Sequence, residues 1–174
     1  MNVASQSVVA EAAFEPMIQI DMEIKAFLSA WFHCDHIATY LARVISHNRT
    51  DSVLHSNLFS SALNELLEVT FRTRHPAGGF VCRVSRHGKT DRVELIFPCT
   101  PDERQFYKDA LLRVGAPEAR ERYRNSLSED LAPSPEVVLF ELAIDYNATL
   151  RLGKEADAGA ITLVVDLPIE GQAN

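Results

Sequence analysis

Apolar and polar side chains alternate along several stretches of the chain. In "MIQIDMEI", residues 17–24, the two kinds stand at alternate positions: Ile18, Ile20, Met22 and Ile24 against Gln19, Asp21 and Glu23. A period of two is typical of a strand with one buried face. "FVCRVSR" and "DRVELIF" alternate in the same way around "HGKT", which predicts an antiparallel β-hairpin. A last pair of strands is predicted within residues 147–168, around a turn rich in Gly, Ala and Asp.

Apolar residues three and four positions apart predict the helices. In residues 36–48 we expect Asp35 to be the N-cap and one face to be buried, formed by Ile37, Leu41, Val44 and Ile45. Other helices are predicted in residues 57–74, 103–114 and 136–146. The highly charged segment 117–130 is predicted to be either a helix or a mobile loop.

The order of these elements predicts the fold class. It reads β-α-α-β-β-α-(α)-α-β-β, and short turns join the strands of each pair. We therefore expect an α/β (α+β) two-layer sandwich, with a mixed, mostly antiparallel sheet and the helices on one face. A single domain is predicted over residues 17–168, between an N-terminal tail, 1–16, and a C-terminal tail, 169–174.

Composition and charge narrow the function classes. The chain has 174 residues, 47% of them hydrophobic, and a net charge of −7. An acidic balance argues against binding nucleic acid or an anionic membrane, which needs a basic surface. No run approaches the roughly 18 apolar residues of a membrane span, and the first residues do not resemble a secretory signal. The three cysteines, Cys34, Cys82 and Cys99, are expected to be reduced thiols of a cytoplasmic protein.

One acidic residue interrupts the apolar stripe of the predicted helix 57–74. At about 100° per residue, Glu65 shares its stripe with Leu58, Ala62 and Val69. The flank of this stripe is polar: Asn57, Ser61, Asn64, Glu68 and Arg72. Burying an ionised carboxylate is costly unless it is paired or hydrogen-bonded. Glu65 is therefore expected to be exposed at the edge of the stripe, paired with another group, or functional.

The sequence around Glu65, "ALNELLEVTFRTRH", resembles the N-box helix of the GHKL (Bergerat-fold) ATPases and kinases. This superfamily includes the anti-sigma-factor kinases and small SiaB-like kinases, and its helix reads E-L-x-x-N-A-x-x-H. The resemblance implies that Glu65 stands where the family has a base or water-orienting group. It makes Asn64, Glu68 and Arg72 the neighbouring candidates for cofactor binding. The family's order of elements matches residues 17–168.

Three departures from the family imply that ATP binding and phosphotransfer have been lost. Val69 stands where the family has the asparagine that helps to hold Mg²⁺, and valine has no oxygen ligand. "ELIFPCTPDE" has no glycine where the family has D-x-G-x-G. In "APSPEVV", Glu136 and Val138 replace the glycines that approach the phosphates. We therefore expect no cofactor, and ATP with Mg²⁺ only if the protein is an active kinase.

Four other groups of residues are candidates for a functional site. "HCDH", residues 33–36, fits no common zinc spacing, and we expect no metal site there. The three cysteines have no local pattern of a thiol enzyme. Arg72, Arg74 and His75 are interpreted as solvated cations at a helix end, with phosphate or an acidic partner as the alternative. Segment 117–130, which covers the nucleotide in the family, is a candidate docking surface.

Three hypotheses of function follow from these patterns. The first is a degenerate GHKL domain that regulates by binding a STAS-domain protein, a phosphatase or a response regulator, and that forms a homodimer. The second is an active protein serine kinase with Glu65 as its base. The third is an unrelated α/β enzyme or ligand-binding protein. Three roles remain open for Glu65: an ordinary residue at the edge of the stripe, the remnant of a base, or a working base.

Overall fold

The alternating stretches form one open sheet of five strands in the order β1-β2-β3-β5-β4. The computed structural model describes residues 14–26, 32–72, 78–128, 134–154 and 159–169. The strands are β1 (Glu15–Glu23), β2 (Gly79–His87), β3 (Thr90–Pro98), β4 (Thr149–Leu152) and β5 (Ala160–Pro168). Every neighbouring pair in this order is antiparallel, including the predicted hairpin of β2 and β3. The α+β class is confirmed, and the described sheet is antiparallel throughout.

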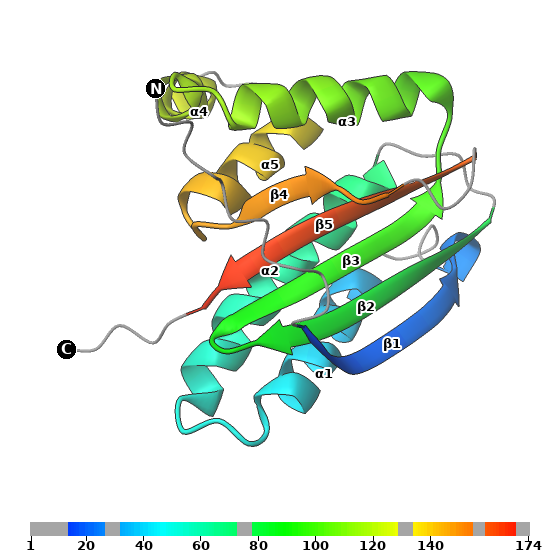
Figure 1. Ribbon diagram of the computed structural model, residues 1–174, viewed down its shortest axis with the longest axis vertical. Helices are drawn as coiled ribbons and strands as arrows, with labels where there is room; N and C mark the ends of the chain where they lie inside the picture. The colour runs from blue at the N-terminus through cyan, green and yellow to red at the C-terminus, as the bar shows by residue number, and fades with distance from the viewer. Residues whose placement is uncertain (1–13, 27–31, 73–77, 129–133, 155–158, 170–174) are drawn as a thin grey trace, which may run out of the picture.

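The helices lie mainly on one side of this sheet (Figure 1). They are the 3-10 turn η2 (Ile24–Ala26) and helices α1 (Phe32–Ser46), α2 (Ser52–Arg72), α3 (Pro101–Val114), α4 (Ala119–Ser128) and α5 (Pro135–Ile144). In Figure 1, α1 and α2 lie behind the sheet, α5 lies behind its β4 edge, α3 runs along that edge, and α4 is seen end-on beside one end of α3. The two layers bury one continuous apolar core between them.

Alternation along the central strands decides which face is buried. The core-facing side chains of β2 and β3 are apolar over most of their length: Phe80, Cys82, Val84, Val93, Leu95 and Phe97. The opposite face carries polar residues, such as Arg83, which donates a hydrogen bond to Gln19 at 2.8 Å. At the turn between the two strands, Gly88 has φ +59°, a conformation that favours glycine. The period of two thus correctly predicted both the strands and their buried side.

Three expectations for the helices are wrong. Helix α1 begins at Phe32, so Asp35 lies in its first turn and is not the N-cap. Val44 is 43% exposed and Leu58 is 36% exposed, although both were expected on buried faces. The reason is that α1 and α2 pack against each other as well as against the sheet. The expected Leu41 and Ile45 are buried on α1, but Ala38 and Ala42 complete that face in place of Val44, and α2 buries Phe59 in place of Leu58.

Capping residues explain where the later helices begin. Thr100 accepts a hydrogen bond from the Glu103 backbone N–H, and the Glu103 carboxylate accepts one from the Thr100 backbone N–H. Ser134 caps α5 in a similar way, with Pro135 as its first residue. The charged segment that was predicted as helix or loop forms α4 over Ala119–Ser128. Within the described residues, no helix combines the length and apolar character needed to cross a membrane.

Candidate functional site

Helix α2 places Glu65 at the boundary between itself and α5. Glu65 is partly exposed, whereas Val69, one helical turn further on, is buried at 1% exposure. The two positions that the family resemblance singles out therefore lie in different surroundings. Glu65 faces other polar side chains, and Val69 packs into the hydrophobic core.

Glu65 lies close to Glu141 and Tyr146 across the α2–α5 boundary. Burial raises the pKa of Glu141 on α5, and the charges of Glu65 and Asp145 raise it further. Burial also raises the pKa of Tyr146, as do the charges of Glu141 and Glu65, against the opposing effect of a hydrogen bond with Ser61. The α2–α5 boundary therefore collects negative charge, which favours a cationic group and opposes a phosphate.

Asn64 and Glu68 lie on a different side of α2. Asn64 Nδ2 donates a hydrogen bond to Glu68 Oε1 at 3.0 Å. Burial raises the pKa of the Cys34 thiol on α1 to about 11, and the charge of Glu68 contributes, so Glu68 lies on the α1 side. Of Arg72 only the backbone is described, at the end of α2. The structure thus does not bring Asn64 and Glu68 to the group around Glu65.

The segments that lack the family's glycines are occupied by ordinary helix starts. Glu136, in the first turn of α5, pairs with Arg113 of α3. Val138 is buried among apolar side chains. The segment after β3 leads into the Thr100 cap of α3. The pairing of Arg113 with Glu136 joins α3 to α5.

The residues of the HCDH stretch lie in the first turns of α1. His33 and His36 both pack edge-on against Phe32, and Cys34 is buried. Across the ranges that the structure describes, no three His, Cys, Asp or Glu side chains are grouped to hold a metal ion. Arg74 and His75 lie outside the described residues.

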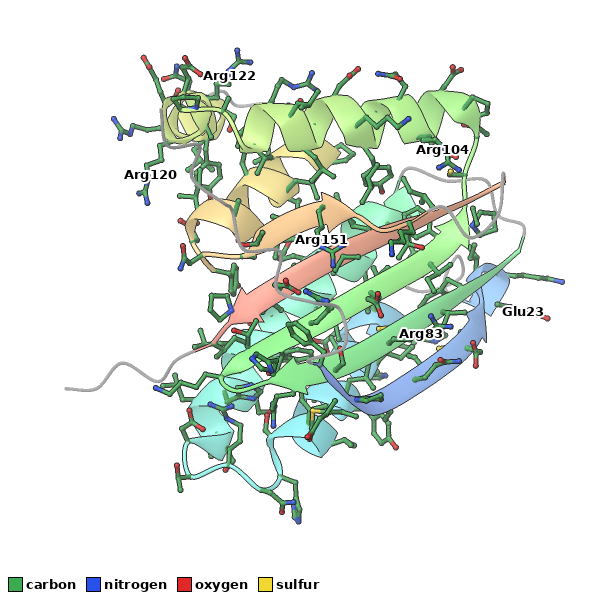
Figure 2. The ribbon with its side chains drawn as sticks, in the orientation of Figure 1. Glu23, Arg83, Arg104, Arg120, Arg122 and Arg151 are labelled. Carbon is green, nitrogen blue, oxygen red and sulfur yellow. The ribbon has the colours of Figure 1, made fainter. Side chains whose placement is uncertain are left out.

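Helix α4 presents a basic outer surface. Its one buried side consists of Ala119 and Tyr123, which pack with Phe140 of α5, and the Tyr123 hydroxyl donates a hydrogen bond to Asp145 at 2.7 Å. Arg120 and Arg122 project away from the body of the molecule (Figure 2). This is the segment that the sequence analysis marked as a docking candidate.

A buried polar network was missed by the sequence analysis. Ser46, His55, Asp91 and Arg86 are joined by hydrogen bonds, and the first three are almost fully buried. Their sequence separation hid the arrangement, and His55 precedes the predicted start of its helix at residue 57. One signal was present: Asp91 begins the alternation that continues through Val93, Leu95 and Phe97, which places a carboxylate on the core side of a strand.

No family model matches this chain, and no curated protein matches it significantly. Among solved structures, a chain of the SiaB-SiaC complex from Pseudomonas aeruginosa superposes with a TM-score of 0.52. This chain shares its fold. The alignment covers 88% of this chain and 90% of the other, at 9% sequence identity. At this identity the likeness to the chain of the SiaB-SiaC complex is one of fold alone.

Proposed function

We propose that this chain is a regulatory protein that acts by binding a protein partner, on a GHKL-like framework that has lost ATP binding. The observation that carries the proposal is the α2–α5 boundary. There the charges of Glu65 and Asp145 both act on Glu141, and the position one helical turn after Glu65 is filled by buried Val69.

These surroundings oppose a bound nucleotide in two ways. Magnesium requires oxygen ligands, and the Val69 side chain has none. A triphosphate adds negative charge to a place that already holds three carboxylates, and like charges at close range repel. The contact between Arg113 and Glu136 also occupies an arginine that would otherwise be available to a phosphate.

The proposed partner is a STAS-domain protein, a phosphatase or a response regulator. The shared fold with a chain of a two-protein complex supports a protein partner, because that protein was crystallised in an assembly. We propose that α4 is the docking element, because its arginines are exposed and point away from the core (Figure 2). Basic residues at the rim of an interface mainly affect the rate of association and its salt dependence.

The loss of ATP binding is tested by thermal unfolding with and without Mg-ATP. A ligand at 100 times its Kd adds about 2.7 kcal/mol of stability. We expect no shift of the midpoint at millimolar Mg-ATP. A shift in the wild type that disappears in Glu65→Ala would contradict the proposal and support an active kinase with Glu65 as its base.

Partner binding is tested by calorimetric titration with proteins of the three named classes encoded beside this chain. The double variant Arg120→Glu/Arg122→Glu should weaken binding roughly 10-fold or more, with most of the change in the association rate. Arg83→Glu is the matched control, because Arg83 lies on the sheet face away from α1 and α2 (Figure 2). Failure of all three classes to bind would refute the proposal, and an equal effect of both variants would move the docking surface away from α4.

A further inference from the structure

A serine, a histidine and an aspartate form a continuous line of hydrogen bonds between the helical layer and the sheet. Ser46 Oγ at the end of α1 lies 2.6 Å from His55 Nδ1 on α2, and His55 Nε2 lies 2.6 Å from Asp91 Oδ2 on β3. Arg86 on β2 completes the line, with its Nε 2.6 Å from Asp91 Oδ1. These side chains come from four different elements, so the tertiary fold holds them in place.

The protonation of this line follows from its aspartate. Burial raises the pKa of Asp91, but hydrogen bonds from His55 and Arg86 outweigh it and hold the pKa below its ordinary value. An ionised carboxylate only accepts hydrogen bonds, so His55 Nε2 carries the proton that faces Asp91. In neutral His55, Nδ1 is then the acceptor, and the Ser46 hydroxyl must be its donor. This is the protonation state in which an imidazole can take a proton from a serine.

Ser46 also borders a hollow of about 370 Å³. The other residues of its wall are almost all polar: Arg43, His47, Ser52, Val53, Ser56 and Asn57. Ser52 and Val53 belong to the first turn of α2, where backbone N–H groups have no acceptor within the helix. Ser46, whose hydroxyl is hydrogen-bonded to a base, thus forms part of the wall of the hollow, beside the N-terminus of α2, whose partial positive charge favours a negatively charged oxygen.

We propose that Ser46 is a nucleophile toward small polar esters that carry a negative charge, with His55 as its general base. Asp91 is a positioning residue that fixes the tautomer and orientation of His55, and Arg86 orients Asp91. The polar and basic wall selects against fatty acyl groups and favours an acyl group with a carboxylate. Because His55 and Asp91 are shielded from water, their hydrogen bonds are stronger than they would be in solvent.

The covalent step balances without an external oxidant or reductant. Ser46 Oγ forms a bond to the ester carbonyl carbon while its proton passes to His55 Nδ1. When the bond to the leaving oxygen breaks, the alcohol departs with that proton, and the acyl group stays on Ser46. Water then attacks the acyl-serine, gives a proton to His55 and releases the acid, and the proton returns to Ser46.

The test is acylation by 4-nitrophenyl succinate, with release of 4-nitrophenolate as the readout, followed by acid quenching within the first turnover, before the acyl-serine is hydrolysed, and peptide mapping. We expect a succinyl group on Ser46 in the wild type and a slower reaction with neutral 4-nitrophenyl acetate. Asp91→Asn should slow acylation at least about 10-fold, and Ser46→Ala should abolish the adduct. Ser60→Ala, on α2 but outside the hollow, is the matched control and should keep it.

Because peptide mapping is done on the wild type, it identifies the acylated residue even if a variant fails to fold. Absence of a succinyl group on Ser46 in the folded wild type would overturn the proposal. A group found instead on Ser52, Ser56 or a lysine would overturn it as well. Thermal unfolding of each variant separates a loss of reactivity from a loss of structure.

Discussion

Asp91 has no exposed surface, yet the residues around it keep it ionised. It accepts hydrogen bonds from His55 and from both Nε and Nη2 of Arg86, which also donates to the Ile45 carbonyl at 3.1 Å. The network thus returns to the last turn of α1, where Ser46 began it. Removing one partner of a buried pair leaves the other charge uncompensated, which costs more than the pair itself contributes.

Replacing Asp91 by asparagine should lower the free energy of unfolding by about 3 kcal/mol at pH 7. The estimate is at the lower end of the range for buried pairs, because the Arg86 side chain is 20% exposed and can reach water. Urea unfolding measures the loss. Asp166→Asn is the control, since the Asp166 side chain is 21% exposed, and it should cost about 1 kcal/mol.

The difference in stability between the wild type and Asp91→Asn should depend on pH. The pKa of Asp91 is lower in the folded state than in the unfolded chain, so the unfolded state binds more protons as the pH falls. The contribution of the ionised Asp91 is complete above its unfolded pKa, at about 4, and is lost as the pH falls through the folded value. The stability difference between wild type and Asp91→Asn should therefore shrink below about pH 4. A constant difference down to pH 2 would contradict this explanation.

Val69 offers a second test at the residue scale. Val69→Asn introduces the asparagine of the motif that this helix resembles, but it places an amide in the core at a position with 1% exposure. We expect a loss of roughly 2–3 kcal/mol in the free energy of unfolding, measured in urea. Mg-ATP should still give no thermal shift, because Glu65, Glu141 and Asp145 remain together. Val69→Thr, which can bond the preceding turn as Thr70 does to the Leu66 carbonyl at 2.7 Å, should lose less.

At the scale of the elements, local patterns predicted most of the fold. The hairpin of β2 and β3 was recognisable because each strand has one buried face and a turn with Gly88 between them. The N-cap at Asp35 was wrong because the helix extends to Phe32, which local polarity could not indicate. Val44 and Leu58 were misplaced because α1 and α2 also pack against each other, and a helical wheel contains no information on the neighbouring helix.

The N-cap of α3 should contribute measurably to the stability of the protein. Thr100→Ala removes the side chain that caps the Glu103 N–H and should cost about 1 kcal/mol in urea unfolding. Thr100→Ser keeps the hydroxyl and should stay close to the wild type. If both variants lose the same stability, the methyl group of Thr100 matters and the cap does not.

At the scale of the whole molecule, the order of the strands could not be predicted from local patterns. The last described strand, β5, lies between β3 and β4, and it is paired with β3 along its length and with β4 from Leu163 to Asp166. Local patterns could not predict which residues meet in the candidate site either. The resemblance to a motif drew attention to Glu65, but Glu141, Asp145 and the partners of Ser46 are neighbours only through the tertiary fold.

The uneven distribution of the core predicts uneven stability. Helix α4 is attached by the small cluster of Ala119, Tyr123 and Phe140 and by the hydrogen bond to Asp145. Its amide hydrogens should exchange through local opening, whereas those of β3 and β5 should require global unfolding. Tyr123→Phe should accelerate exchange in α4 about fivefold, for a loss of about 1 kcal/mol. Equal acceleration in β3 would show that α4 does not open on its own.

The central place of β5 has a consequence for synthesis on the ribosome. Until β5 emerges, β4 has no strand to pair with, and the backbone groups along one side of β3 lack their final partners. The growing chain therefore carries an unfinished sheet edge from the completion of β3 at Pro98 until Ala160 is reached, and such edges readily pair with other chains. A nascent chain stalled before residue 160 should consequently depend on chaperones far more than the finished protein does.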